Sequence, residues 1–386
     1  MPRLRVLNSI TGLNFGGAEL MLARYLRGLR AESSIEPSVL SLMTPGPVGD
    51  RIAAMGVDIR TLAMREARPR LGALAGLRRA CSSTDPVLLH GWMYHGNLAA
   101  SIAAMVHRRQ PVIWSVHHSL DDIDTEKPMT RWLIRLSARL SARTAAISYC
   151  SRVSADQHER LGFDVSKRRV IPNGIDCSEF RPDARAGALL RRELGIPAKR
   201  LLVGNVARAH PMKDHGGFVR MIGHLLARGF DVQGVIVGAG HEAGVARGVA
   251  AELGISERIT TAGPRDDMPA VVAGFDLYAL SSAWGEAFPL SVAEAMACGV
   301  PAIVTDVGDC GWLVGAGELV TPPRTPAAQA EAAARLLALS ATARRQVGAH
   351  ARRRIVEKFS LENYVRLHLD IYDEALAAHA FREAVA

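Results

Sequence analysis

Short apolar segments alternate with longer, helix-compatible segments along the chain. In the first half, runs of apolar residues predict strands at 5–10, 38–43, 87–91, 111–117 and 144–148. Helical spacing of apolar residues lies between them, at 18–30, 96–107 and 131–143. The alternation then begins again, with strands expected at 201–207, 232–238, 258–263, 276–282 and 301–305. Because strands that alternate with helices pair in parallel, the sequence predicts two α/β domains, each a doubly wound parallel sheet.

A break in this pattern separates the two halves. The segment VIPNGID, residues 170–176, combines a proline with an Asn-Gly turn, which interrupts regular structure. We therefore expect one domain at 1–170 and a second at 171–386. The tail from Ala327 onward predicts consecutive helices, and the last of them, from about residue 361, is expected to pack back on the first domain.

Composition indicates a folded, globular protein. The chain has 386 residues, more than one hydrophobic core usually spans, with 48% hydrophobic and 22% charged residues, which excludes collagen, coiled-coil and disordered classes. Five scattered cysteines without a C-x-x-C spacing favour reduced thiols over a disulfide framework or a zinc ribbon. No segment has the apolar length of a signal peptide or a membrane span, so we expect a cytoplasmic protein.

The positive charge is concentrated in the first half. The formal net charge is +9, yet residues 1–170 hold 24 Lys and Arg against 14 Asp and Glu, while the rest of the chain is close to neutral. An anionic partner is therefore expected on this half: lipid headgroups, a diphosphate-linked substrate or nucleic acid. Nucleic acid ranks last, because aromatic residues make up only 5% and no recognition helix is apparent.

One helix in this half is both basic and amphipathic. In residues 131–143 arginines recur at every fourth position beside three leucines: Arg131, Arg135, Arg139 and Arg143 with Leu133, Leu136 and Leu140. Such a helix could bind an anionic membrane surface. An ordinary surface helix with its leucines on the core is the favoured alternative.

The segment SSAWGEAFPLSVAEAMACGVPAIVT, residues 281–305, carries the strongest candidate site. Pro289 is suited to the first turn of a helix that follows a strand, and the free amides of that turn can hold a diphosphate. Glu286 before the helix and Glu294 within it could each bind hydroxyl groups of one ligand. The alternative is two unrelated acids, one in a solvated loop and one on a helix surface.

Two further candidates also follow predicted strands, where open α/β sheets bind ligands. Arg208 and Lys213 lie five residues apart, and only five of the 47 cationic residues are lysines, so Lys213 suggests a point charge aimed at phosphate. Two solvated loop cations are the alternative. Gly16-Gly17 could let the backbone approach a phosphate, or could merely close a tight turn.

Histidines and acids after the strand at 111–117 are weaker candidates. His117 and His118 end this strand, where a histidine can donate to a hydroxyl or a phosphate, and strand alternation should turn one of the two away. The segment DDID, residues 121–124, contains the D-x-D pattern with which a different transferase fold holds a metal ion. In a polar loop, a solvated segment is the favoured interpretation.

Together these segments resemble the retaining GT-B glycosyltransferases of family four, of the bacterial surface-polysaccharide type. The resemblance rests on Glu286 and Glu294 with seven residues between them, and on paired glycines, PNGID, VGAGH and AGPRDDMP in the family's order over nearly the whole chain. It implies two Rossmann-like domains that face each other across a cleft. The acceptor would bind to the N-terminal domain and the nucleotide sugar to the C-terminal domain.

The resemblance also implies roles for single residues. Arg208 and Lys213 would act on the donor diphosphate, helped by the amides at Pro289, Leu290 and Ser291. Glu294 would hold the nucleotide ribose and Glu286 the transferred sugar. Donor contacts would also come from Gly238, from the backbone around Arg265 and from Gly16 and Gly17, and His117 would be catalytic. One departure stands out: the chain reads TDVGDCGWL, so Asp309 and Cys310 occupy a segment where the family often has a further Glu.

The implied reaction is transfer of a hexosyl group, with retained configuration, from a nucleoside diphosphate sugar, with a UDP-sugar favoured. The acceptor would be a glycan or a polyprenyl-diphosphate-linked sugar in lipopolysaccharide or capsule synthesis, at the inner face of the cytoplasmic membrane. No metal or cofactor is expected, because two cations and a helix N-terminus can stabilise the leaving diphosphate. The alternative is a nucleotide-sugar epimerase of the same architecture, which needs no acceptor.

Overall fold

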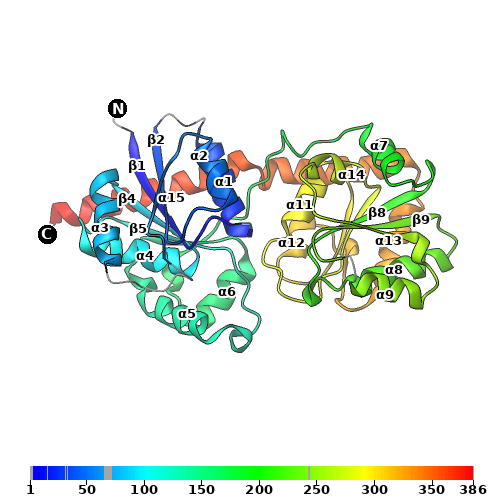
Figure 1. The fold of residues 1–386 in the computed structure, drawn as a ribbon, viewed down its shortest axis with the longest axis horizontal. Coiled ribbons are helices and arrows are strands. Elements are labelled where there is room, and N and C mark those ends of the chain that lie inside the picture. Colours follow the sequence, from blue (N-terminus) through cyan, green and yellow to red (C-terminus); the bar gives the residue numbers. More distant parts are fainter. Residues whose placement is uncertain are drawn as a thin grey trace. The chain divides into compact units, whose positions relative to one another are not determined.

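The chain forms two separate α/β units. A computed structural model describes residues 3–14, 16–30, 32, 34–64, 72–241 and 244–385. Unit 1 comprises Met1–Gly174 with Leu361–Ala386, and unit 2 comprises Ile175–Ser360 (Figure 1). The chain therefore passes from unit 1 to unit 2 within the VIPNGID segment, and its C-terminal helix belongs to unit 1.

Unit 1 is built on a seven-stranded parallel sheet in the order β3-β2-β1-β4-β5-β6-β7. The strands are β1 (Leu4–Ile10), β2 (Ile35–Ser41), β3 (Asp58–Thr61), β4 (Leu88–Trp92), β5 (Val112–Val116), β6 (Ala146–Tyr149) and β7 (Arg168–Val170). The helices are α1 (Gly17–Leu29), α2 (Pro47–Ala53), α3 (Ala73–Thr84), α4 (Met93–Val106), α5 (Pro128–Leu140), α6 (Arg152–Arg160) and α15 (Leu361–Val385). Strands β4 and β5 are buried over their whole length, as expected for central parallel strands with helices on both faces.

The C-terminal helix α15 packs directly against α1. Gly28 of α1 leaves no room for a side chain there, because a Cβ atom would lie 2.6 Å from Cγ2 of Val365. The hydroxyl of Tyr372 on α15 is also hydrogen-bonded to Nδ1 of His90 on β4, at 2.7 Å. Close packing and a buried hydrogen bond thus hold α15 in the core of unit 1.

Unit 2 is built on a six-stranded parallel sheet in the order β10-β9-β8-β11-β12-β13. The strands are β8 (Leu201–Val206), β9 (Val232–Val237), β10 (Ile259–Ala262), β11 (Leu277–Leu280), β12 (Ala302–Thr305) and β13 (Val320–Thr321). The helices are α7 (Ala186–Glu193), α8 (His215–Ala227), α9 (Val245–Glu252), α10 (Met268–Ala273), α11 (Leu290–Ala297), α12 (Cys310–Val314), α13 (Pro326–Leu337) and α14 (Ala341–Lys358). Successive residues of β11 belong alternately to two hydrophobic clusters, which fill the two faces of the sheet.

The predicted fold class, two Rossmann-like parallel sheets, is confirmed, and each predicted strand overlaps an observed one. The sequence did not predict β3, β7 or β13. All three lie at sheet edges, where DIRT, RRV and VT are too short or too polar to form an apolar run. Among the described residues, no helix is long and apolar enough to cross a bilayer.

Candidate functional site

The candidate site of unit 2 lies where four loops meet at the carboxyl edge of its sheet. The strand order runs outward from β8 in one direction and from β11 in the other, so the connections diverge between these two strands. Ligands of open α/β sheets bind at such a switch point. Hydrogen bonds join the loops here: Ala283 N donates to Met212 O at 2.8 Å, and Thr305 Oγ1 to Ser282 O at 2.6 Å.

The centre of this site is an ion pair between Lys213 and Glu286. Lys213 Nζ lies 2.5 Å from Glu286 Oε1, and the two side chains are 18% and 7% exposed. Ser282 Oγ donates to the same carboxylate oxygen at 2.5 Å. The two residues that the sequence assigned to different parts of one donor are therefore in direct contact. With so little water around the pair, each side chain is the main electrostatic partner of the other.

The backbone around the pair is held from both sides. Ser281 Oγ donates to Lys213 O at 2.8 Å, which ties the loop after β11 to the loop after β8. Gly285 adopts a φ of +77°, and a Cβ atom there would collide with the side chain of Met212. Both the left-handed backbone at position 285 and the nearby side chain of Met212 favour a glycine there.

The amino terminus of α11 faces the same edge. Pro289 is the N-cap of α11 rather than a residue of its first turn, and it has no N–H to donate, which corrects that prediction. Val292 N and Ala293 N both donate to Pro289 O, so the amides of Leu290 and Ser291 are the ones free to bind an anion. Ser291 Oγ accepts a hydrogen bond from Tyr278 OH at 2.7 Å.

Tyr278 lies between the two predicted carboxylates. Burial raises the pKa of its hydroxyl, and the charges of Glu286 and Glu294 raise it further. Its OH also accepts a hydrogen bond from Val206 N at 3.2 Å, at the end of β8. Glu294 itself is buried on the second turn of α11, where its charge, after burial, contributes to raising the pKa of Cys298 to about 12. The charges of Glu286 and Glu294 thus both act on the Tyr278 hydroxyl.

Arg208 is the exposed cation of this edge. Among the described residues, its guanidinium has no hydrogen-bond or ion-pair partner. Its backbone runs against the loop after β9, where Gly238 has a φ of +150° and a Cβ atom would overlap Ala207 O. Gly238 thus permits the approach of two loops, and Arg208 is free to bind an added anion.

Arg265, in contrast, is already occupied. Its guanidinium forms ion pairs with Glu193 and with Asp267, the latter at 2.6 Å, and hydrogen bonds to these partners raise its pKa. Only the backbone around Arg265, for which the family resemblance implies a donor contact, is left for a ligand.

The segment with the missing family acid packs on the Glu286 loop. Gly308 has a φ of +58°, and a Cβ atom there would collide with Glu286 O. Asp309 is buried, and its backbone N donates to Ala287 O at 3.4 Å. Burial, followed by the charge of Glu286, raises the pKa of Cys310. Asp309 and Cys310 are thus structural supports of the Glu286 loop.

Three site residues were missed from the sequence: Ser282, Tyr278 and His215. Burial, followed by His241 and Lys213, lowers the pKa of His215 to about 4, so a neutral imidazole lies near the lysine. Its Nε2 is buried with no hydrogen-bond partner among the described residues. His215 follows Lys213 closely in the chain, and this proximity was the available indication; for Ser282 and Tyr278 no pattern pointed to the site.

In unit 1, His117 is the candidate with the most defined geometry. Its Nδ1 donates to Asn173 Oδ1 at 3.0 Å, and its ring stacks on Trp92, with centroids 5.3 Å apart and planes at 5°. Burial lowers its pKa to about 4, so the ring is neutral at neutral pH. Nε2 therefore carries a lone pair, and it is buried without a hydrogen-bond partner among the described residues.

His118 differs from His117 in its contacts. Its Nδ1 lies 3.2 Å from Tyr94 OH, and its Nε2 lies 3.4 Å from Glu126. Strand β5 ends at Val116, so the two histidines lie after the strand rather than on it, and both are half-buried. Strand alternation therefore does not apply to this pair, and the contacts distinguish the two residues instead.

Gly16-Gly17 lies at the start of α1, as expected. Gly16 is the N-cap, and no side chain caps this helix. A Cβ atom at Gly16 would collide with the carboxylate of Glu19 in the first turn, whose pKa is raised by burial. An anion bound at this helix terminus would therefore meet a carboxylate, which the sequence analysis did not consider. Phe15, in the same motif, lies outside the described residues.

The carboxylates of the DDID segment are engaged within the protein. Asp122 accepts a hydrogen bond from Asp124 N, Asp124 pairs with Arg131 at 3.0 Å, and Asp121 accepts from Gln157. Over the part of the chain that the structure describes, no group of three His, Cys, Asp or Glu side chains is arranged to hold a metal ion.

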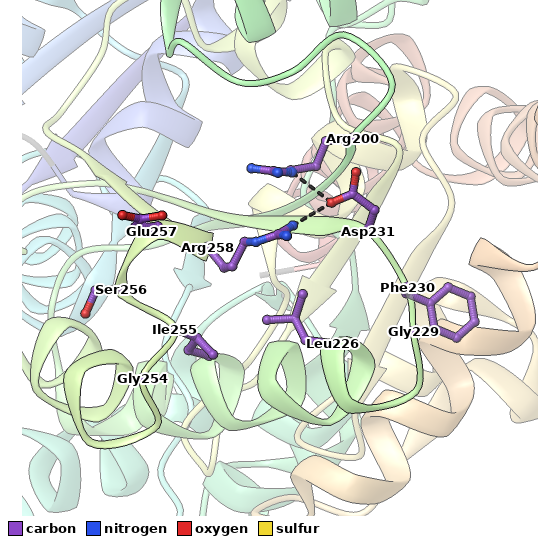
Figure 2. Close-up of a pocket in the computed structure, with 10 residues that line it drawn as sticks. All are labelled: Arg200, Leu226, Gly229, Phe230, Asp231, Gly254, Ile255, Ser256, Glu257 and Arg258. Carbon is purple, nitrogen blue, oxygen red and sulfur yellow. Dashed lines mark hydrogen bonds and ion pairs between the residues drawn. The ribbon is translucent and has the colours of Figure 1, made fainter.

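A cavity of unit 2 lies at the opposite, amino-terminal edge of the sheet. It has a volume of about 800 Å³ and is lined by residues just before β8, β9 and β10 (Figure 2). At its rim Asp231 is held between Arg200, at 2.9 Å, and Arg258. Two guanidinium groups therefore share one carboxylate at this rim, and none of the predicted site residues lines the cavity.

The two parallel sheets, with the switch point between β8 and β11, define a GT-B fold. Residues 188–354 match the family Glycosyl transferases group 1, and residues 15–179 match Glycosyltransferase Family 4, so the two matches fall on the two units. The chain therefore belongs to the glycosyltransferases of group 1 and family 4.

Individual relatives agree with this assignment. The chain is 32% identical over 247 residues to a D-inositol 3-phosphate glycosyltransferase of Salinispora tropica, a match that spans 59% of this chain but only 50% of that relative. It is 26% identical to the putative glycosyltransferase EpsF of Bacillus subtilis, over 78% of this chain and 79% of the relative. The structure of Anabaena HepE in complex with UDP has a TM-score of 0.81 at 20% identity, covering 96% and 99% of the two chains. HepE has also been solved with UDP-glucose.

Proposed function

We propose that this glycosyltransferase moves a hexosyl group from a UDP-sugar to a glycan or to a lipid-linked acceptor, with retained anomeric configuration and without a metal ion. The observation that carries the proposal is the Lys213–Glu286 pair beside the open amides of α11, with Glu294 on the same helix. A nucleoside diphosphate sugar needs these groups: cations and amides for the diphosphate, and carboxylates for hydroxyls. The solved complexes of HepE with UDP and with UDP-glucose support the choice of donor.

Leaving-group stabilisation is the chemistry that these residues can perform. As the bond between the anomeric carbon and the phosphate oxygen breaks, its electron pair passes to the diphosphate, where negative charge develops. Lys213, the free Arg208 and the amides of Leu290 and Ser291 would stabilise that charge. The acceptor oxygen forms the new bond to the anomeric carbon on the same face, and its proton passes to the departing phosphate.

The positive charge of unit 1 supports an anionic or lipid-linked acceptor. Counted over Met1–Gly174 and Leu361–Ala386, unit 1 holds 26 Lys and Arg against 19 Asp and Glu, whereas unit 2 holds 21 against 19. A diphosphate-linked acceptor in the synthesis of cell-surface polysaccharide, used at the cytoplasmic face of the membrane, has the complementary charge. His117, with a neutral and accepting Nε2, would receive a hydrogen bond from a sugar hydroxyl.

Product analysis tests this proposal. The protein is incubated with UDP-glucose, UDP-galactose or UDP-N-acetylglucosamine, with and without lipid extract as a source of acceptor. We expect UDP release that depends on the acceptor and a new α-glycosidic bond, detected by NMR. Inversion of configuration would overturn the retaining mechanism. A free epimer of the donor sugar without an acceptor would indicate the epimerase instead.

A further inference from the structure

The exposed surface of α5 combines apolar and cationic side chains. The inner face of the helix is used by the core: Leu133 and Ile134 are buried in the main hydrophobic cluster of unit 1. The leucine face that the sequence offered for membrane contact is therefore not available. The outer face is different, because Met129 is 64% exposed and Trp132 is 58% exposed.

The cations of α5 lie on the same outer face as Trp132. Arg135 and Arg139 are exposed and follow Trp132 by three and seven residues, which places all three side chains along one line of the helix. Arg143, four residues further, is also exposed, and Lys127 is exposed just before the helix begins. Trp132 and Met129, three residues apart, form the apolar end of this row.

Nearby acids do not neutralise this outer face. Helix α5 contains no Asp or Glu at all. Of the acids that precede it, Asp124 pairs with Arg131 at 3.0 Å and Glu126 lies 3.4 Å from His118. Asp121 accepts from Gln157 at 2.8 Å, and Asp122 accepts from the backbone N of Asp124 at 2.8 Å. The exposed guanidinium groups of Arg135 and Arg139 have no ion-pair partner among the described residues.

We propose that the outer face of α5 docks on an anionic lipid surface, with Trp132 and Met129 in the interface and Arg135, Arg139, Arg143 and Lys127 on lipid phosphates. A tryptophan with one polar end prefers the membrane–water interface, and Trp132 is 58% exposed beside a row of arginines. The docking would bring a lipid-linked acceptor to the edge of the sheet where β5 ends. This purpose rests on the proposed function, whereas lipid binding itself does not.

Vesicle sedimentation of the whole protein tests the docking surface. Vesicles of phosphatidylcholine with phosphatidylglycerol are compared with vesicles of phosphatidylcholine alone, at low and at high salt. We expect binding to the anionic vesicles that weakens at least tenfold at high salt and in Arg135→Gln/Arg139→Gln, since each cation near such a surface contributes about fivefold. Trp132→Ala should weaken binding by a similar factor, and bromine-labelled lipid should quench the fluorescence of the wild type but not of this variant.

A matched control removes equal charge from another exposed helix. Arg345→Gln/Arg353→Gln on α14 of unit 2 should bind vesicles like the wild type. Wild-type binding by the α5 variants, equal binding to neutral vesicles, or equally tight binding to soluble dextran sulfate would overturn the proposal. UDP binding by the same α5 variants separates the two hypotheses. Lost vesicle binding with intact UDP binding concerns α5 alone, and failure of the wild type to bind UDP concerns the proposed function.

Discussion

Lys213 Nζ and Glu286 Oε1 lie 2.5 Å apart, although 73 residues separate them in the sequence. The contact brings the loop after β8 to the loop after β11, on the two sides of the switch point of the unit 2 sheet. Both side chains are largely buried, so the pair depends on both members: one alone would be a charge in a place poorly reached by water. A diphosphate sugar bound here would share both of them.

Breaking this pair should destabilise the protein strongly. In Lys213→Met the Glu286 carboxylate stays buried without its cation, and we expect a loss of about 3–5 kcal/mol in the free energy of unfolding. The double variant Lys213→Met/Glu286→Gln should recover a large part of that loss, because no uncompensated charge remains. Denaturant unfolding of the two single variants and the double variant measures this coupling. Additive effects would show that the pair is not coupled.

Replacing Arg208, unlike replacing Lys213, should affect UDP binding and not stability. Because its side chain is exposed and forms no ion pair among the described residues, Arg208→Ala should change the free energy of unfolding by less than about 0.5 kcal/mol. The affinity for UDP should nevertheless fall about tenfold or more, since a cation that contacts a diphosphate is removed. Thermal unfolding and UDP titration of one preparation test both halves. A stable variant with wild-type affinity would remove Arg208 from the site.

Glycine 308 should tolerate no side chain. Its φ of +58° disfavours an L-residue, and a Cβ atom would collide with Glu286 O, so Gly308→Ala should cost more than about 2 kcal/mol of stability. Gly248→Ala is the matched control, because Gly248 lies within α9 with nothing within 4 Å of a Cβ atom. The control should gain about 0.5–1 kcal/mol. Equal effects of the two substitutions would contradict this account of the Glu286 loop.

Buried histidines should make unit 1 sensitive to mild acid. Burial lowers the pKa of His117 and His158 to about 4 and that of His368 to about 3, from 6.5. As pH falls from 7.5 to 5.5 the unfolded chain takes up protons at these residues while the folded unit does not. Stability is thus lost on acidification, by about 1.4 kcal/mol for each of the three histidines, or about 4 kcal/mol in all.

The pH series needs one variant as a control. His368→Phe keeps an aromatic ring on Trp92 but removes one titrating group, so about a third of the pH dependence should disappear. Urea unfolding of the wild type and the variant at pH 7.5, 6.5 and 5.5 measures the pH dependence of the free energy of unfolding. A free energy of unfolding that does not change over this range would contradict the neutral, buried state of these rings.

Metal independence gives a further prediction. If Lys213, Arg208 and the α11 amides stabilise the leaving diphosphate, turnover should be unchanged within about twofold in EDTA. Activity that is lost in EDTA and restored by Mg²⁺ or Mn²⁺ would show that a divalent ion performs that step.

The sequence was sufficient where chemistry and strand pattern coincide. Apolar runs located the interior strands, and the rule that ligands bind after strands selected Lys213 and Glu286, which are in direct contact in the structure. The sequence did not predict which side chains from distant segments contact one another. Three contacts of this kind join segments that are distant in the sequence, so no local pattern encodes them. They are the ion pairs Lys213–Glu286 and Arg265–Glu193 and the stacking of Trp92 on His117.

The sequence also did not predict how side chains are oriented at the ends of strands and helices. The pattern placed His117 and His118 on a strand, but β5 ends one residue earlier, and the loop geometry then decides what each ring contacts. Pro289 was placed one position too far into its helix for a similar reason, because a proline fits both the N-cap and the first turn. Exposure of Trp132 could not be read either, since its neighbours Leu133 and Ile134 have the same apolar character.

Calorimetric titration of UDP tests the central claim, that one anionic diphosphate binds at the carboxyl edge of the unit 2 sheet. The wild type is compared with Arg208→Ala, with Ser291→Pro, which removes an α11 amide, and with Arg200→Ala at the opposite edge. The account predicts UDP binding by the wild type and by Arg200→Ala, and a loss of tenfold or more in the other two variants. Binding that is weakened by Arg200→Ala and unaffected by Arg208→Ala and Ser291→Pro would place the diphosphate elsewhere and contradict it.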